Sequence, residues 1–224
     1  MDFQRRITRF RELVSRQGRA GFLVTKCASL RYLFGFTGSN GICLITPTGA
    51  FFISDFRYRK QLQSEISGCE IIITSKSLVE GLRSLPVLDS RQKFGFEAGH
   101  ITFTKYQQLH ELFARIDWCP TDKLIEILAV VKDEEEIDYL RQAAELADGI
   151  FSELLPLVHP GMRESEVAAE ILYRCKKNGG ERAPFQPGVA SGEHSVYPHG
   201  RTGDKIIDAG ELLTHSLREL LELD

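Results

Sequence analysis

The residues whose types and spacing best suit chemistry lie in a polar segment at 185–204, which contains His194 and His199. The segment has no helical period and little apolar content, and a long segment of this kind inside a compact domain is usually functional or disordered. Pro198 restricts the backbone before His199, and Gly200 leaves space after it. This spacing predicts an imidazole held out into a cleft, where it can donate, accept or change its charge. An incidental histidine on a surface loop is the alternative.

A second group of possible ligands follows near the end of the chain, and its members are carboxylates and one imidazole: Glu211, His215, Glu219, Glu222 and Asp224. In a helix, His215 and Glu219 would share one face, a spacing that can bind a metal ion. Leucine-rich segments with interspersed acids are, however, usually ordinary amphipathic helices. No dense cluster of His, Cys and Asp occurs elsewhere in the sequence, so we expect no metal site in this chain.

The composition is ordinary for a soluble globular protein of one or two domains, with 42% hydrophobic and 26% charged residues among 224. A net charge of -3 argues against a nucleic-acid partner, which would normally require a basic face. No apolar run is long enough to span a membrane, and the N-terminus lacks the apolar region of a secretory signal. The cysteines, at positions 27, 43, 69, 119 and 175, form no C-x-x-C pair, which favours buried reduced thiols in a cytoplasmic protein.

Strands and helices alternate over roughly the first 120 residues. We expect helices at 3–17, 56–66, 77–85 and 104–114, a short helical or irregular piece at 30–36, and strands at 20–25, 42–45, 50–53, 70–74, 94–96 and 116–119. Pro47, Thr48 and Gly49 are turn residues and predict a hairpin between two of the strands. This order is typical of an α/β domain with a mixed sheet flanked by helices.

The pattern changes near Lys132, where Asp133 and Glu136 have the spacing of a capping box. A stripe of apolar residues then predicts one long helix: Ile137, Leu140, Ala144, Ala147, Phe151 and Leu154. A second helix is expected at 164–177, ended by two glycines, and a strand at 205–207. We place the domain boundary between residues 125 and 126, which gives domains at 1–125 and 126–224.

The order of these features resembles that of the creatinase/prolidase/aminopeptidase P family, whose catalytic domain has the pita-bread fold. Five motifs carry the resemblance: residues 30–39 (LRYLFGFTGS); residues 53–58 (ISDFRY); Val131-Lys132 with Glu136-Ile137 and 141–143; Pro160-Gly161 with Glu164 and 166–168; and 189–192 (VASG) with Pro198-His199-Gly200. The similarity extends to about Leu213. Each motif alone is weak, and the five in the right order are fairly specific.

The resemblance implies an N-terminal mixed sheet flanked by helices, followed by the first part of a pita-bread α+β domain. It implies hydrolysis of Xaa-Pro peptide bonds with two divalent, manganese-like metal ions, a proline-containing peptide as substrate, and a homo-oligomer. His199 would then be the substrate-side histidine, hydrogen-bonded to the scissile carbonyl or to the leaving proline portion. His194 matches no functional position of the family, so we expect it to be a solvated loop histidine.

The chain departs from the family pattern after Thr214. The family continues with a strand that carries the first metal-ligand aspartate in an Ile-Asp-Phe-Gly segment, whereas this chain continues with His215-Ser-Leu-Arg. None of the family's metal ligands can be assigned, so we expect residues 1–224 to be inactive, through a frame change or truncation near 214–215. The two helices after Lys132 would then expose apolar faces, which predicts self-association.

Two alternatives to a peptidase remain. One is a non-enzymatic role, in which the N-terminal domain is an oligomerisation or binding module. The other is a metal-independent amidinohydrolase like creatinase, in which the histidine at position 199 is the general acid and base. The second alternative also needs carboxylates that this sequence does not contain.

Overall fold

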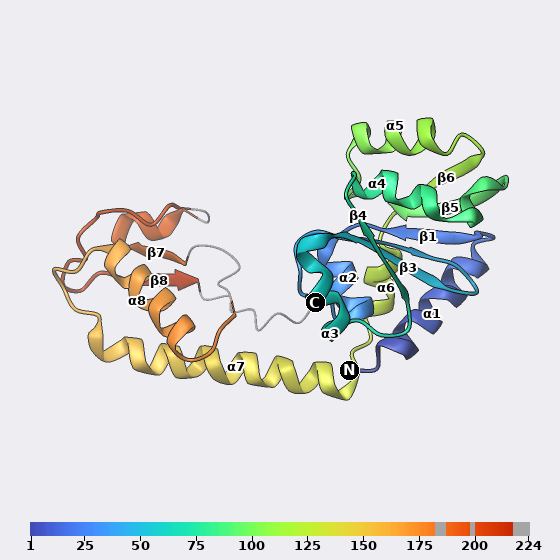
Figure 1. Cartoon of the computed structure of the whole chain (residues 1–224). Coiled ribbons are helices and arrows are strands. Elements are labelled where there is room, and N and C mark those ends of the chain that lie inside the picture. Colours follow the sequence, from blue (N-terminus) through green and yellow to red (C-terminus); the bar gives the residue numbers. More distant parts are fainter. Residues whose placement is uncertain (182–186, 198–199, 217–224) are drawn as a thin grey trace. The chain divides into compact units, whose positions relative to one another are not determined.

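A mixed sheet organises the first part of the chain, with its six strands in the order β4-β3-β2-β1-β5-β6 (Figure 1). They are β1 (Gly21–Val24), β2 (Ile42–Ile45), β3 (Ala50–Asp55), β4 (Glu70–Thr74), β5 (Gln92–Glu97) and β6 (Ile116–Thr121). β2 is antiparallel to β1 and β3, whereas the pairs β1–β5, β5–β6 and β3–β4 are parallel. All strands except β2 therefore point the same way, and their carboxyl ends meet at one edge of the sheet. The predicted mixed α/β sheet is confirmed.

The computed structural model describes residues 1–181, 187–197 and 200–216. The chain divides into two units, Met1–Val131 and one that begins at Lys132. We call them the N-terminal unit and the second unit. The boundary expected between residues 125 and 126 falls inside the helix α6 (Leu124–Ala129), and the assignment of domains to its two sides stays a prediction.

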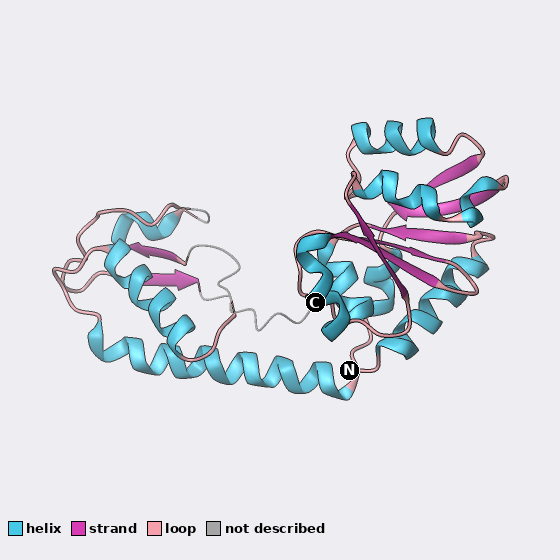
Figure 2. Cartoon of the chain, in the orientation of Figure 1, coloured by secondary structure: helices cyan, strands magenta, loops and turns pink. Residues whose placement is uncertain are grey.

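Helices cover both faces of the sheet (Figure 2). On one face lie α1 (Phe3–Arg16), α2 (Cys27–Phe34), α3 (Arg59–Glu65) and α6, and on the other lie α4 (Leu78–Gly81) and α5 (Phe103–Leu112). Cys43 and Ile45 of β2 pack into the first core, whereas Ile42 and Leu44 pack into the second. Burial on both faces explains why these strands are continuous apolar runs.

The local signals in the N-terminal unit were predicted well. The hairpin between β2 and β3 closes through a bond of 2.8 Å from Thr46 N to the carbonyl of Gly49. Ser77 caps α4 in a capping box with Glu80, but this helix ends at Gly81 rather than near residue 85. Short 3₁₀ turns follow it: η2 (Leu82–Ser84) and η3 (Pro86–Asp89). Another one, η1 (Phe56–Tyr58), precedes α3.

The second unit contains α7 (Glu134–Leu154), η4 (Leu155–Leu157), α8 (Glu164–Lys177), β7 (Gly188–Ser191), η5 (Gly192–Val196) and β8 (Leu213–Ser216). The predicted capping box of α7 is confirmed, since Glu136 N donates to Asp133 at 2.9 Å and Asp133 N donates to Glu136 at 2.8 Å. β7 and β8 are antiparallel, and Ala190 lies opposite Thr214. A small core joins the helix layer to this hairpin: Leu154, Val167, Ala168, Ile171, Val189 and Ile207.

The strand expected at 205–207 is wrong, because Ile206 forms only an isolated bridge with Arg163. The backbone of this segment pairs instead with the irregular chain before α8: Ile207 N donates to Met162 O at 2.8 Å. The strand of this region is β8, so His215 lies in a strand and not in a helix. Glu219, Glu222 and Asp224 lie outside the described residues, and the helical spacing expected for a metal site is absent at His215.

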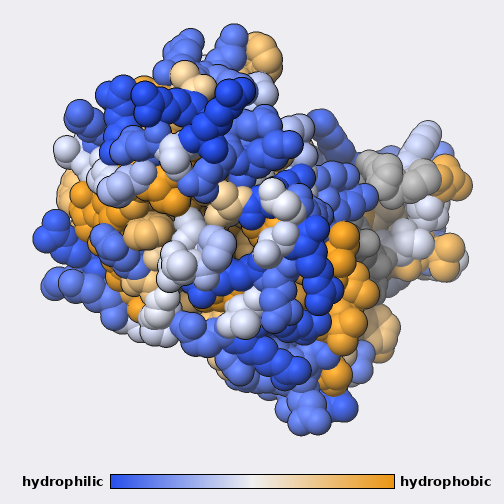
Figure 3. Space-filling view, turned by 90° about the vertical axis from the view of Figure 1, so that its right-hand side faces the viewer, coloured by the Kyte–Doolittle hydropathy of each residue, from blue (hydrophilic) through white to orange (hydrophobic). Residues whose placement is uncertain are grey.

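The apolar stripe of α7 is largely uncovered. Ile137 is 39% exposed, Leu140 48% and Phe151 41%, whereas Ile150 and Leu154 are buried. On the face shown in Figure 3, hydrophilic residues predominate and apolar residues gather in separate patches. Among the described helices, none combines the length and the apolar character that crossing a membrane requires.

Candidate functional site

Pro198 and His199 lie outside the described residues, but the chain on both sides of them is described. Before them come β7 and η5, and after them the segment from Gly200 to Lys205 leads back toward α8. Gly200 N donates to Tyr197 O at 3.1 Å, so the two sides approach each other. We call residues 188–205 the histidine loop. The residues that bind this loop and hold it in place make up the candidate site.

Glu164 holds the histidine loop from two sides. It is the first residue of α8 and is 0% exposed. One carboxylate oxygen accepts from Ser191 N at 2.7 Å and from Ser191 Oγ at 3.1 Å. The other lies 3.2 Å from His194 Nδ1 and accepts from Gly203 N at 3.3 Å. A carboxylate at the start of a helix also interacts favourably with the helix dipole.

These hydrogen bonds keep Glu164 charged. Burial alone raises the pKa of a carboxyl group, because it removes the charged form from water. At Glu164 the bonds from the Ser191 amide, His194, the Ser191 hydroxyl and the Gly203 amide outweigh burial, and the pKa of the carboxyl is lowered below 4.5. A carboxylate whose two oxygens are occupied by donors positions the chain and is not available as a general base.

His194 was expected to be a solvated loop histidine, and it is partly exposed but also has a protein partner. Its side chain is 39% exposed, and its Nδ1 faces the buried carboxylate of Glu164. In the tautomer with the proton on Nδ1, the ring donates to this carboxylate and leaves Nε2 as an acceptor. The sequence signal for this contact was absent, because the two residues lie 30 positions apart.

Lys205 and Glu211 form a second anchor beside Glu164. Lys205 Nζ lies 2.7 and 2.9 Å from the two carboxylate oxygens of Glu211 and 3.0 Å from Ser191 Oγ. The pKa of Glu211 is lowered and the pKa of Lys205 is raised, in each case chiefly by hydrogen bonding to the other. Gly192 has a φ of +49°, and its Cα lies against the Glu211 side chain, so a side chain at this position would clash with it.

The described residues do not fit the metal ions that the family resemblance implies. Among residues 1–181, 187–197 and 200–216, no group of three or more His, Cys, Asp or Glu side chains is arranged to hold a metal ion. The two carboxylates that anchor the histidine loop already have partners, Glu164 with amides and His194, and Glu211 with Lys205. Within the described chain, Glu164 and Glu211 orient the loop and its histidine, and their carboxylates are engaged by protein donors rather than arranged around a metal site.

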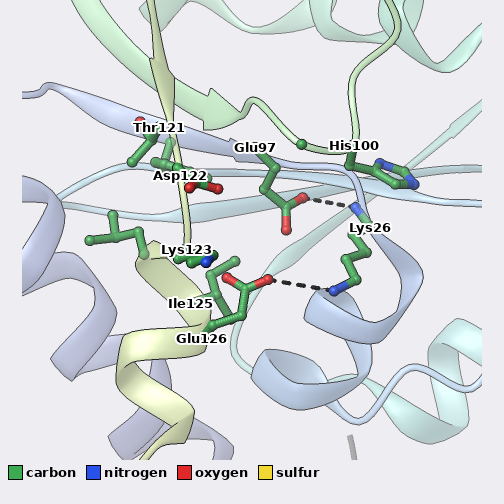
Figure 4. A pocket seen from close by; sticks show the side chains of 11 residues that line it. Lys26, Glu97, His100, Thr121, Asp122, Lys123, Ile125 and Glu126 are labelled. Carbon is green, nitrogen blue, oxygen red and sulfur yellow. Dashed lines mark hydrogen bonds and ion pairs between the residues drawn. The ribbon is translucent and has the colours of Figure 1, made fainter.

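A pocket of about 150 Å³ lies in the N-terminal unit and is lined by Lys26, Glu97, His100 and Glu126 among others (Figure 4). Glu97 accepts from Thr25 N at 2.6 Å, from Lys26 N at 2.8 Å and from Ser29 Oγ at 2.5 Å. α2 has no cap from its own N-cap side chain, so Glu97 replaces that cap from the end of β5. This role is structural, and the sequence analysis missed it.

The comparisons with known proteins cover nearly the whole chain. Residues 6–131 match the model of the creatinase/prolidase N-terminal domain, and residues 138–217 match that of metallopeptidase family M24. An uncharacterized peptidase of Bacillus subtilis, YqhT, is 34% identical over 209 residues, which are 93% of this chain and 59% of that protein. A Pyrococcus horikoshii protein named Xaa-Pro dipeptidase is 27% identical over 218 residues, 94% of this chain and 59% of its own.

Solved structures of similar proteins agree with these sequence matches. The Xaa-Pro dipeptidase from Bacillus anthracis superposes with a TM-score of 0.88 at 33% identity, and the match covers 95% of this chain and 60% of that one. The X-Pro aminopeptidase from Thermotoga maritima has a TM-score of 0.82 at 29% identity, with 93% and 59% covered. The chain therefore spans about three fifths of the length of these relatives.

Proposed function

The chain belongs to the creatinase/prolidase family, and from this premise we propose that it derives from an Xaa-Pro peptidase that depends on divalent metal ions. In this proposal, residues 1–224 supply the N-terminal domain and one wall of the catalytic cleft, and they do not hydrolyse peptides on their own. The observation that carries the proposal is the match of residues 138–217 to metallopeptidase family M24. The names of the relatives give the substrate class, a peptide with proline after the scissile bond.

The anchoring of the histidine loop supports a substrate-side role for His199. Glu164 binds Ser191 before this position and Gly203 after it, so one buried carboxylate determines where both sides of the loop lie. A loop fixed in this way can present an imidazole to a bound peptide with little loss of conformational entropy. His199 would donate a hydrogen bond to the scissile carbonyl or to the leaving proline portion.

The proposal that residues 1–224 are inactive alone rests on the carboxylates of the second unit. Glu164 accepts from Ser191 and Gly203, and Glu211 accepts from Lys205, so both anchoring carboxylates are already engaged by protein donors. We also propose a cytoplasmic location, for which the scattered cysteines are the argument.

An activity assay tests this proposal directly. Xaa-Pro dipeptides and peptides that begin with Xaa-Pro are incubated with the 224-residue protein, with and without Mn²⁺, and bound metal is measured in parallel. We expect no turnover, and we expect His199→Ala to change nothing. Cleavage that Mn²⁺ stimulates would overturn the inactive assignment, and His199→Ala should then reduce it by about two to four orders of magnitude. The matched control is His110→Ala, on the exposed side of α5, which should leave such activity unchanged.

A second candidate function, assembly through the second unit, is favoured by the uncovered stripe of α7. Ile137, Leu140 and Phe151 are each more than a third exposed on a single helix, and apolar surface of this kind favours self-association. We expect light scattering to show an oligomer at high concentration. Replacing Leu140 and Phe151 together by glutamate should dissociate it, whereas Gln142→Glu on the same helix should not. A monodisperse monomer at high concentration would count against this role.

A further inference from the structure

A cavity of about 310 Å³ opens beside the carboxyl edge of the sheet in the N-terminal unit. Its floor is apolar and includes Leu23, Ile42 and Leu109, and its lining also includes the charged residues Asp55, Lys76 and Lys105. These lining residues come from β1, β2 and the end of β3, from the turn after β4, and from α5. Among the described residues, the cavity shares no lining residue with the histidine loop or with the pocket around Glu97. The two N-terminal sites are connected through Thr25, which lines the cavity and donates to Glu97.

The cavity exists because the helix layer on this face is incomplete. α4 has only four residues and continues as 3₁₀ turns, so it is too short to cover the strands it follows. α5 packs on the same side through Leu109, which is fully buried. Between these two helices, Leu23 and Ile42 of the central strands lie at the base of the cavity, packed within the second core and only 1% and 5% exposed.

The charges around the cavity favour an anion. Neither Lys76 nor Lys105 forms an ion pair with any residue in the described part of the chain. Asp55 does not oppose an anion strongly, because Arg57 binds its two oxygens at 2.9 and 2.8 Å and Asn40 donates to it at 2.6 Å. The other acid near Lys76, Glu80, is held by Ser77 in the capping box of α4. The cavity therefore has two lysines without an ion pair in the described chain, of which Lys76 interacts electrostatically with Glu80, beside an Asp55 carboxylate whose charge Arg57 compensates.

We propose that this cavity binds a small amphipathic anion, with an apolar body on Leu23, Ile42 and Leu109 and a carboxylate or phosphate head at Lys76 and Lys105. The cavity volume is at the lower end of the range for ligand pockets, and an apolar wall with a few polar groups is their usual lining. Its place agrees with the rule for open α/β sheets, whose ligands bind outside the carboxyl ends of the strands. This inference does not depend on the peptidase proposal, and its failure would leave that proposal untouched.

Titration calorimetry on the full 224-residue protein tests the proposal with matched probes. Octanoate and octyl phosphate carry the two possible heads, octanamide has the same chain without charge, and acetate has a head without the chain. We expect one or both anionic probes to bind, octanamide to bind about five- to tenfold more weakly, and acetate not to bind detectably. The stronger of the two anionic probes identifies the head group. Methyl NMR should place the largest shifts at Ile42, Val79 and Ile101, which line the cavity.

Substitutions that preserve the fold provide the second measurement. Lys76→Gln and Lys105→Gln should each weaken binding about two- to fivefold, and the double variant should multiply the two effects. The control is Lys60→Gln, an exposed lysine of α3 away from the cavity, which should bind like the unchanged protein. Equal binding of octanoate and octanamide, no binding at millimolar concentration, or methyl shifts centred on α7 would each overturn the proposal. A dimer that both lysine substitutions dissociate, with no probe bound, would show that a second copy occupies the cavity and would also overturn it.

Discussion

Ser191 and Glu164 are 27 positions apart in sequence, and the amide and the hydroxyl of Ser191 both donate to one oxygen of the Glu164 carboxylate, at 2.7 and 3.1 Å. The other oxygen accepts from Gly203, which lies 39 positions from Glu164. One side chain at the start of α8 therefore fixes the chain both before and after positions 198 and 199. This arrangement makes the buried carboxylate, and not the exposed surface of the loop, the determinant of loop geometry.

Replacing Glu164 by alanine should loosen the histidine loop. The substitution leaves the buried amide of Ser191 and the half-buried amide of Gly203 without their acceptor, which costs about 1–3 kcal/mol for a buried group. We expect the amide hydrogens of Ser191 and Gly203 to exchange about tenfold faster or more, measured by hydrogen–deuterium exchange with mass spectrometry.

The matched control for this prediction is Glu145→Ala, which removes an exposed glutamate of α7. A surface substitution of this kind usually changes stability by less than about 0.5 kcal/mol, so the loop should exchange as in the unchanged protein. Unchanged exchange at Ser191 and Gly203 in Glu164→Ala would show that β7 and β8 hold the loop without the carboxylate.

The stability of the second unit should fall in acid. The pKa values of Glu164 and Glu211 are lowered from 4.5 in the folded protein. Each carboxylate therefore contributes stability that is fully present above its unfolded pKa and is lost as the pH falls through its folded pKa. The raised pKa of Lys205 acts only in strong base and does not change this window.

Urea denaturation between pH 7 and pH 3 measures this effect, with Glu164→Gln as the comparison. The glutamine cannot titrate, so the difference in midpoint between the two proteins should be largest near neutral pH and should shrink below about pH 4.5. A difference that stays constant over this range would mean that the hydrogen bonds of Glu164 do not depend on its charge.

Gly192 should not tolerate alanine. Its φ of +49° lies in the left-handed region, and a Cβ would collide with the side chain of Glu211, which Lys205 holds in place. We expect a loss of about 1–3 kcal/mol in the free energy of unfolding. Gly149→Ala is the opposite case, because Gly149 lies inside α7 and a Cβ there would meet no atom within 4 Å. It should gain about 0.5–1 kcal/mol. Equal effects of the two substitutions would show that the turn at Gly192 adapts.

The features that sequence analysis predicted correctly depend on neighbours in the chain. The capping box of Asp133 with Glu136 needs two residues three positions apart. The hairpin at 47–49 likewise depends on local turn chemistry, and the buried strands follow from continuous apolar runs. The order of motifs in the first 131 residues was then enough to indicate the N-terminal fold.

The features that sequence analysis missed depend on partners far away in the chain. Nothing near Glu164 signals that it meets residues 191 and 203, and Ile206 and Ile207 have the composition of a strand although their backbone pairs with an irregular segment. The placement of His199 stays a prediction, because this residue lies outside the described chain. Its expected role rests on the family motif and on the anchors at Ser191 and Gly203.

Replacing Glu97 tests, in the N-terminal unit, the same kind of carboxylate anchor that Glu164 provides in the second unit. Its carboxylate accepts from two amides at the start of α2, so Glu97→Ala should leave both without a partner and lower the free energy of unfolding by about 2–3 kcal/mol. Trp118 is the single tryptophan and is buried in the same unit, so its fluorescence during urea denaturation reports this change. The control is Glu126→Ala, which removes only an exposed ion pair with Lys26 at 3.5 Å and should cost less than about 1 kcal/mol. A loss no larger for Glu97→Ala than for this control would mean that water replaces the carboxylate as the cap of α2.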